Sequence, residues 1–316
     1  MFRWPAWVLA VVAATAVTAA GCQSGAIQGG PETRTSVAQA ATIPGRLVFA
    51  FQRQKDPAAL KDDADALGKA LEASLGTPVD VLIPTSYGAT VQALISGRAH
   101  VAYLSSLPFL LAERETDVEI LLVEQRGGKT DYDSVFVVAK DSPIRALADL
   151  EGKRMACTSP TSASGYVFPY GFLVEQGLIE RGARPDTFFS QTQFAGSYDR
   201  ALTAVLRGRA DVAAVSDYTM EGATADKYLP AAERAKLRVL ARVPGVPTHL
   251  IAVRSDLPSE FREKIRETLL RLAEEQPERL KDVYGAAEFV VPTGDHIASS
   301  RAALERTGLA SDTVVE

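Results

Sequence analysis

Two segments of this 316-residue chain match each other without a gap, at an offset of 111 residues. Each segment reads as a helix, a glycine turn and a strand. The eight identities are Ser86-Tyr87 with Ser197-Tyr198, Gly97-Arg98-Ala99 with Gly208-Arg209-Ala210, Val101-Ala102 with Val212-Ala213, and Ser105 with Ser216. Two copies are too few for a solenoid, so the repeat predicts two topologically equivalent α/β lobes.

Short apolar runs alternate with segments of helical period from residue 45 onward. Strands are expected at 47–51, 79–83 and 99–104, and helices at 56–76 and 87–95. The first helix opens with an aspartate cap followed by proline and closes at a glycine, which are the usual boundary signals. Alternation of this kind predicts parallel βα units. The predicted fold class is therefore α/β, with two mixed-sheet lobes.

The repeat also divides the chain. The second lobe is expected to occupy residues 134–247. The first lobe takes 46–133, and the chain returns to it through a strand at 249–253 and a helix at 258–272, so that all of 248–316 belongs there. Two passages between the lobes predict a two-strand hinge about which a bilobed molecule can close.

The N-terminus has the pattern of a secretory signal. Arg3 precedes an apolar run of about 13 residues and small residues follow it, so 1–21 is predicted to be a signal peptide. The run is shorter than the ~20 residues of a membrane-spanning helix. Residues 19–22 resemble a bacterial lipoprotein processing site, which implies a lipid on Cys22. The alternative is an ordinary cleaved signal that leaves Cys22 free. Residues 22–45, rich in Gly, Ser, Thr and Ala, read as a linker to the membrane.

Charge and residue counts exclude several classes. With 34 Lys+Arg against 39 Asp+Glu, the net charge is −5, so no nucleic-acid partner is expected. Two cysteines and three scattered histidines do not form a metal site, and no cofactor is predicted. Neither a Gly-x-Ser-x-Gly nucleophile elbow nor a complete Walker-type Gly-x-x-x-x-Gly-Lys-Ser/Thr run is present, which argues against a serine hydrolase and a nucleoside triphosphatase. The chain is therefore predicted not to be an enzyme.

A ligand is expected where the strands of both lobes end, because open α/β sheets bind ligands beyond their carboxyl ends. The segment 158–166 follows a strand and opens a helix, whose free amide groups can hold an oxyanion, with Ser162 and Ser164 as additional donors. Alternatively, Thr161, Ser162 or Ser164 only caps that helix. Pro169 lies too deep for a first-turn proline and predicts an irregular first turn. His249, on the returning strand, is expected to lie far from this segment.

Several motifs together resemble the phosphonate- and phosphite-type substrate-binding proteins of bacterial ABC importers. The resemblance covers roughly residues 47–272. It is carried by Phe49-Ala50-Phe51-Gln52 with Asp56-Pro57, Pro84-Thr85-Ser86-Tyr87, Val101-Ala102-Tyr103-Leu104, Ser134-Val135-Phe136-Val137-Val138, Pro160-Thr161-Ser162-Ala163-Ser164-Gly165-Tyr166, Phe194-Ala195-Gly196-Ser197 and Ala213-Ala214-Val215-Ser216-Asp217. It implies a type II periplasmic-binding-protein fold that closes on a small phosphorus oxyanion and delivers it to a permease.

The resemblance also implies roles for individual residues. Segment 160–166 would be the oxyanion loop, with Ser162 and Ser164 as the main donors, and Tyr87 would reach the oxyanion from the other lobe. Asp217 would meet the ammonium group of an aminoalkylphosphonate. Without such a group Asp217 could select a protonated oxyanion, and the alternative is a capping or solvated carboxylate. The other cleft candidates are Thr161, Gln52, Tyr103 and Ser105.

Two positions depart from the family pattern. Ala163 stands where Thr is usual, which removes a hydroxyl, and Tyr198 stands where many members have His, which replaces a titratable group by a neutral phenol. Both changes favour a monoanion, or a neutral oxyacid such as arsenous acid, over a dianion.

The sequence therefore predicts an extracytoplasmic, lipid-anchored and monomeric binding protein of an ABC importer for phosphite, phosphonate or phosphate. The alternative is a binding protein that senses another small oxyacid, for example arsenite, and signals to a membrane receptor kinase.

Overall fold

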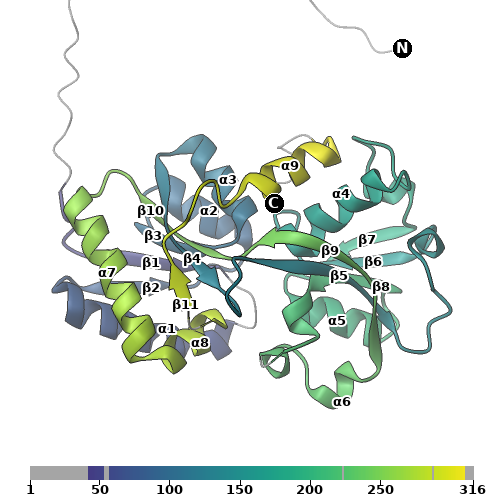
Figure 1. Cartoon of the computed structure of the whole chain (residues 1–316), viewed down its shortest axis with the longest axis horizontal. Coiled ribbons are helices and arrows are strands. Elements are labelled where there is room, and N and C mark those ends of the chain that lie inside the picture. Colours follow the sequence, from purple (N-terminus) through teal and green to yellow (C-terminus); the bar gives the residue numbers. More distant parts are fainter. Residues whose placement is uncertain (1–41, 53–56, 223, 287, 310–316) are drawn as a thin grey trace, which may run out of the picture. The chain divides into compact units, whose positions relative to one another are not determined.

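A computed structural model describes residues 42–52, 57–222, 224–286 and 288–309. The predicted signal peptide, Cys22, most of the 22–45 linker and the Asp56 cap lie outside these ranges. Within them the chain forms two mixed β-sheets flanked by helices (Figure 1). The predicted fold class, α/β with two mixed-sheet lobes, is confirmed.

The first sheet has six strands in the order β11-β4-β10-β3-β1-β2. The strands are β1 (Leu47–Phe51), β2 (Val79–Leu82), β3 (Val101–Leu104), β4 (Val118–Gln125), β10 (Leu250–Arg254) and β11 (Glu288–Val290). The helices packed with it are α1 (Pro57–Leu75), α2 (Tyr87–Ile95), α3 (Ser106–Glu115), α7 (Ser259–Glu275) and α8 (Pro277–Tyr284). Strands β2, β1 and β3 run parallel, and β10 is antiparallel to its neighbours β3 and β4.

The second sheet has five strands in the order β7-β6-β8-β5-β9. The strands are β5 (Asp131–Ala139), β6 (Arg154–Cys157), β7 (Gln191–Phe194), β8 (Val212–Ser216) and β9 (Leu237–Pro247). The helices are α4 (Phe168–Glu175), α5 (Tyr198–Leu206), α6 (Ala231–Arg234) and α9 (Ala298–Thr307). Strands β7, β6 and β8 run parallel, and β5 is antiparallel to its neighbours β8 and β9.

The two sheets confirm the internal repeat. Five strands of the first sheet, β2-β1-β3-β10-β4, have the same order and directions as the whole of the second, β7-β6-β8-β5-β9. The repeated segments form α2-β3 and α5-β8. Each repeat helix begins at the tyrosine of its Ser-Tyr pair, Tyr87 in one lobe and Tyr198 in the other. The repeat therefore places one tyrosine at the same end of each sheet.

The apolar pattern explains why the first helix packs where it does. Leu60, Ala64, Leu67 and Leu71 recur at helical spacing along α1, and all four are buried in the core of the first lobe. Burying a leucine side chain contributes about 1.5–3 kcal/mol. The α1 face that carries them is therefore held against the sheet by the hydrophobic effect.

The chain passes between the sheets at 126–130 and at 248–249, and it passes again toward the second lobe between β11 and α9. The C-terminal segment differs from its predicted place. Helix α9 packs on α4 and β9 of the second lobe and also contacts α3, so it lies between α3 and α4 (Figure 1). The sequence had placed all of 248–316 in the first lobe. At Gly171 the two helices approach closely, because a Cβ atom there would lie 3.2 Å from the Ala303 carbonyl oxygen. Hydrophobic periodicity does not reveal such a contact.

Candidate functional site

The segment after β6 begins its helix with an irregular turn, as Pro169 predicted. Residues Ala163–Val167 form a π turn, in which the amides of Val167 and Phe168 donate to the carbonyls of Ser162 and Ala163, five residues back. Regular α4 follows, with Pro169 as its second residue. Single π turns of this kind are frequent at functional sites. Ser162 caps the turn, because its Oγ accepts from the Gly165 amide at 3.0 Å.

The same loop depends on one glycine for close packing. A Cβ atom on Gly165 would lie 2.2 Å from Thr158 Oγ1 and 2.7 Å from Ser162 Oγ. The Thr158 hydroxyl is buried, and no hydrogen-bond partner for it is found among the described residues. Thr161 is held inside the loop, where its Oγ1 lies 3.0 Å from Ser159 Oγ. Ala163 is buried in the π turn. The loop therefore places several polar groups in a small, closely packed volume.

Ser164 is the centre of a network of buried hydroxyl groups. Its Oγ lies 2.8 Å from Ser216 Oγ and 2.9 Å from the Tyr198 hydroxyl, and it accepts from the Tyr132 hydroxyl at 3.3 Å. Ser134 Oγ donates to the Ser164 carbonyl at 2.6 Å. A serine hydroxyl has one donor and two acceptor positions, so these three partners use its full capacity. Ser164 can reach a ligand only by exchanging one of them.

The first lobe contributes Tyr87 and the hydrogen-bonded pair of Gln52 and Ser105. Gln52 Oε1 accepts from the Ser105 amide at 3.0 Å, which ties the end of β1 to the end of β3. The buried Tyr87 hydroxyl makes no hydrogen bond of good geometry among the described residues. Burial raises the pKa of Tyr87 well above its ordinary value, and nearby Tyr198 and Tyr132 raise it further. The two repeat tyrosines thus lie near each other across the lobes.

The sequence analysis missed an aromatic and ionic cluster beside these groups. It consists of Glu124, Arg126, Tyr132, Tyr218, Tyr228, Tyr284 and His249. Tyr103, a predicted site residue, donates to Glu124 Oε1 at 2.5 Å and to the Tyr284 carbonyl at 3.2 Å, so its hydroxyl is engaged within the first lobe. Tyr218 directly follows the motif that ends at Asp217, whereas Arg126 lies at the first crossing, where no motif marks it.

His249 corrects the expectation that it lies far from the oxyanion loop. Its ring stacks on Tyr103 at 5.2 Å between centroids and on Tyr132 at 6.4 Å, and the Tyr132 hydroxyl reaches Ser164. Burial, together with the charge of Arg126, lowers the pKa of His249 to about 3. The imidazole is therefore neutral at physiological pH and is one side chain away from the hydroxyl network.

Asp217 is not brought together with the other predicted residues. Its Oδ1 accepts from the Tyr218 amide at 2.7 Å, at the start of the 3₁₀ turn η4 (Asp217–Thr219). Its charged neighbours are Asp133 and Arg242. Burial raises the pKa of Asp217. The side chain of Ser216, the residue before it, contacts Ser164 instead. The two adjacent side chains therefore contact different parts of the protein.

Polar groups without partners converge on the boundary between the lobes. The hydroxyls of Tyr218 and Tyr284 are buried and have no hydrogen-bond partner in the described part of the chain, and the Tyr87 hydroxyl has only Gln52 nearby, without good geometry. Leaving such a group unsatisfied costs about 1–3 kcal/mol. A cavity of about 20 Å³, roughly the room for one water, lies between Gln52 and Tyr284. Tyr284 lines this cavity, whereas Tyr87 and Tyr218 do not.

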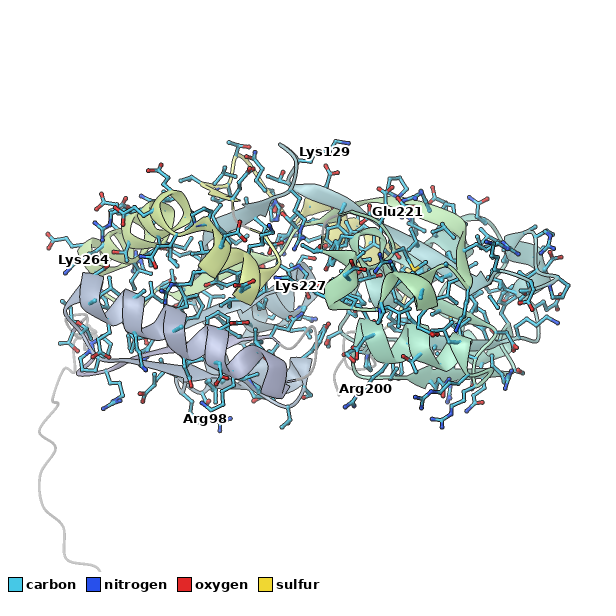
Figure 2. All side chains as sticks on the ribbon, turned by 90° about the horizontal axis from the view of Figure 1, so that it is seen from below. Arg98, Lys129, Arg200, Glu221, Lys227 and Lys264 are labelled. Atoms are coloured by element: carbon cyan, nitrogen blue, oxygen red, sulfur yellow. The ribbon has the colours of Figure 1, made fainter. Side chains whose placement is uncertain are left out.

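An ion pair borders this cavity. Lys227 Nζ of the second lobe lies 3.1 Å from Asp282 Oδ1 of the first, and Figure 2 shows Lys227 where the two lobes meet. No group of three or more metal-ligating side chains occurs within the described ranges. The helices described there include none with the length and apolarity to cross a membrane.

Comparison with known proteins places the chain among binding proteins. Residues 49–297 match the family described as the periplasmic substrate-binding protein of phosphonate ABC transporters. The chain is 24% identical over 220 residues to the phosphate-import protein PhnD of Mycolicibacterium smegmatis, covering 68% of each chain. It is 28% identical over 202 residues to the phosphonates-binding periplasmic protein of Escherichia coli, covering 62% of this chain and 56% of that one.

Solved structures agree on the fold. PhnD1 from Prochlorococcus marinus in complex with methylphosphonate superposes with a TM-score of 0.73 at 18% identity, covering 84% of this chain and 98% of that one. A binding protein component of an ABC phosphonate transporter from Pseudomonas aeruginosa gives a TM-score of 0.72 at 21% identity, covering 82% and 85%. At these identities the similarity shows the fold alone, and it confirms the predicted type II periplasmic-binding-protein fold.

Proposed function

The chain belongs to the family of periplasmic substrate-binding proteins of phosphonate ABC transporters, and from that membership we propose that it captures a small phosphorus oxyanion and delivers it to a permease. The family places it outside the cytoplasm, with a small ligand and transporter subunits as partners. The candidate ligands are phosphite, phosphonate and phosphate. Its action is binding and lobe closure, without catalysis.

The observation that carries this proposal is the set of unpartnered hydroxyls beside the loop 158–166. Thr158, within this loop, and Tyr218 each bury a hydroxyl that has no hydrogen-bond partner within the described ranges, and the buried Tyr87 hydroxyl makes no bond of good geometry there, although Gln52 lies nearby. An oxyanion offers several acceptor oxygens in a small volume, and each bond to a charged acceptor contributes about 1.5–3 kcal/mol. The amides at the start of the π turn add the positive end of a helix. Such a ligand would satisfy groups that are otherwise buried at a cost.

The structure refines the role that we propose for each residue. Ser162, Thr161 and the backbone of Ala163 form the loop that meets the anion, and Tyr87 and Tyr198 approach it from opposite lobes. Ser164 positions Tyr198 and Tyr132 through its hydroxyl bonds. Gln52, Ser105 and Tyr103 form the first-lobe side of the proposed site. Asp217 acts on Tyr218 through its backbone amide.

The charges favour a ligand of low charge. The guanidinium of Arg126 is balanced by the Glu124 carboxylate at 3.1 Å, and Lys227 is balanced by Asp282. The remaining groups named above are neutral hydroxyls. A monoanion loses less hydration than a dianion when it enters such surroundings, so it is the better fit. The alternative of an arsenite sensor is not favoured, because the named relatives are import and binding proteins.

Ligand screening by thermal shift, confirmed by calorimetry, tests the proposal. The panel is phosphite, methylphosphonate, 2-aminoethylphosphonate, phosphate, sulfate and arsenite. A ligand at a thousand times its Kd stabilises the folded protein by about 4.1 kcal/mol, which gives a clear upward shift in Tm. We expect a phosphorus oxyanion to give the largest shift. A folded protein that responds to none of them would refute the proposal.

We also propose that Cys22 carries the lipid anchor of a monomeric protein. Replacing Cys22 by Ala should move the protein from the membrane fraction to the soluble fraction and abolish incorporation of labelled palmitate. Light scattering of the soluble form should give the mass of one chain. Continued membrane association of the Ala variant would contradict the anchor.

A further inference from the structure

Arg126 is anchored to the first lobe by the edge of its guanidinium group. Its nitrogens donate to Glu124 Oε2 at 3.1 Å, to the Gly285 carbonyl at 3.0 Å and to the Tyr284 carbonyl at 3.4 Å. Glu124 is itself fully buried and also accepts from Tyr103. These bonds fix the guanidinium plane at the point where the chain leaves β4 for the second lobe.

The face of the same guanidinium meets an aromatic ring of the second lobe. Its central carbon lies 4.4 Å from the centroid of the Tyr218 ring. Tyr218 follows β8, and its ring packs on Tyr132 at 5.2 Å, on Tyr228 at 5.8 Å and on Tyr198 at 6.2 Å. The contact therefore joins the ion pair of one lobe to the tyrosine cluster of the other. A cation over an aromatic face is attracted most strongly where water is excluded, as it is here.

We propose that the contact between Arg126 and Tyr218 is a latch that holds the lobes closed. The edge of the guanidinium stays with the first lobe, so rotation of the second lobe about the crossings at 126–130 and 248–249 must lift Tyr218 from its face. Closure restores the contact and, in the same step, sets Tyr198 and the unpartnered Tyr218 hydroxyl opposite Tyr87. Arg126 is then a positioning residue, which acts on the ligand through the tyrosine cluster.

Distances between spin labels test the latch without any ligand. Arg98 lies on the first lobe and Arg200 on the second (Figure 2), and both are exposed, so cysteines placed there report the separation of the lobes. The background carries Cys22→Ser, and native Cys157 is fully buried in β6. Tyr218→Phe keeps the aromatic face and loses only the hydroxyl, whereas Tyr218→Leu loses the face. We expect the ligand-free Leu variant to shift toward longer distances and the Phe variant to keep the wild-type distribution.

A second pair of substitutions removes the cation instead of the ring. Arg126→Met alone would leave Glu124 charged and unpaired in the interior, so it is combined with Glu124→Gln. This double variant should show the same long distances as Tyr218→Leu. If it fails to fold, as judged by circular dichroism, the two Tyr218 variants still decide. Identical distance distributions for Tyr218→Leu and Tyr218→Phe would overturn the latch.

The ligand arm of the experiment rests on the proposed function. With methylphosphonate as the probe, the dissociation rate of Tyr218→Leu should exceed that of Tyr218→Phe by about two- to thirtyfold, the range that a cation–π contact supplies. Equal dissociation rates would count against the latch. Failure of methylphosphonate and the other phosphorus oxyanions to bind the wild type would refute the proposed ligand class, while the ligand-free distances would still judge the latch.

Discussion

The phenol oxygen of Tyr198 lies 2.9 Å from the hydroxyl oxygen of Ser164, and Ser164 in turn lies 2.8 Å from Ser216. Tyr198 is the first residue of α5, so this contact ties the start of one repeat helix to the oxyanion loop. Its counterpart Tyr87 begins α2 of the other lobe, and its hydroxyl makes no comparable bond. The hydroxyl of one repeat tyrosine is thus bonded within its own lobe, and that of the other makes no such bond.

Replacing Ser162 by Ala should weaken both binding and folding. Loss of a hydrogen bond to an anion should reduce affinity by about 1.5–3 kcal/mol, or one to two decades in Kd. Loss of the bond from the Gly165 amide should lower the free energy of unfolding by about 0.5–2 kcal/mol. Calorimetry and urea unfolding measure the two effects. Ser142→Ala, which removes a similar bond to the Ile144 amide outside the cleft, should leave Kd unchanged. If Ser162→Ala binds with wild-type affinity, the Ser162 hydroxyl does not contact the ligand.

Replacing Gly165 by Ala should distort the oxyanion loop. The added Cβ would lie 2.2 Å from Thr158 Oγ1, and overpacking of this kind costs about 1–3 kcal/mol. We expect a lower Tm and a loss of ligand-induced thermal shift. Gly45→Ala is the matched control, because a Cβ there meets nothing within 4 Å. If both variants have the Tm and the ligand-induced shift of the wild type, the close packing at Gly165 affects neither stability nor binding.

Tyr87→Phe and Tyr103→Phe should have different effects on the free energy of unfolding of the ligand-free protein. The Tyr87 hydroxyl is buried without a partner, so removing it should leave the ligand-free protein as stable as before, or up to about 1 kcal/mol more stable, while weakening ligand binding. The Tyr103 hydroxyl donates to Glu124 at 2.5 Å, so its loss should destabilise the fold. Chemical denaturation with and without phosphite or methylphosphonate makes the comparison. A large destabilisation by Tyr87→Phe would show that its hydroxyl is already satisfied.

His249 should make the protein less stable in acid. Burial lowers its pKa to about 3 from an ordinary value of 6.5, so the unfolded chain binds a proton below pH 6.5 that the folded chain does not. Stability is unaffected by this group above pH 6.5 and falls below it, by about 1.4 kcal/mol per pH unit for one such group. His249→Gln should reduce the slope of unfolding free energy against pH between 6.5 and 5. An unchanged slope would mean that His249 titrates normally in the folded protein.

Much of the fold could be predicted because its signals are local. The helix at 87–95 lies where the sequence predicted it, since Ser86 caps it and accepts from the Ala89 amide at 3.1 Å. Strand β1 also has its predicted bounds. Helix α9 was misplaced because it packs on α4 and β9, which are far from it in sequence, and approaches Gly171 of α4 closely. The hydrophobic periodicity of the sequence gives no information about a contact between two distant elements.

The site was predictable only in part, for a related reason. The amino-acid sequence by itself determined the two-lobe repeat, the loop after β6 and the serine and tyrosine residues at the strand ends, because periodicity, caps and repeats depend on neighbours along the chain. Tertiary structure decided that Ser164 binds Tyr198, that His249 stacks on Tyr103, and that Arg126 faces Tyr218. Hydrogen bonds and cation–π contacts depend on distances of a few ångströms between residues far apart in sequence, and only the packing of the two sheets sets those distances.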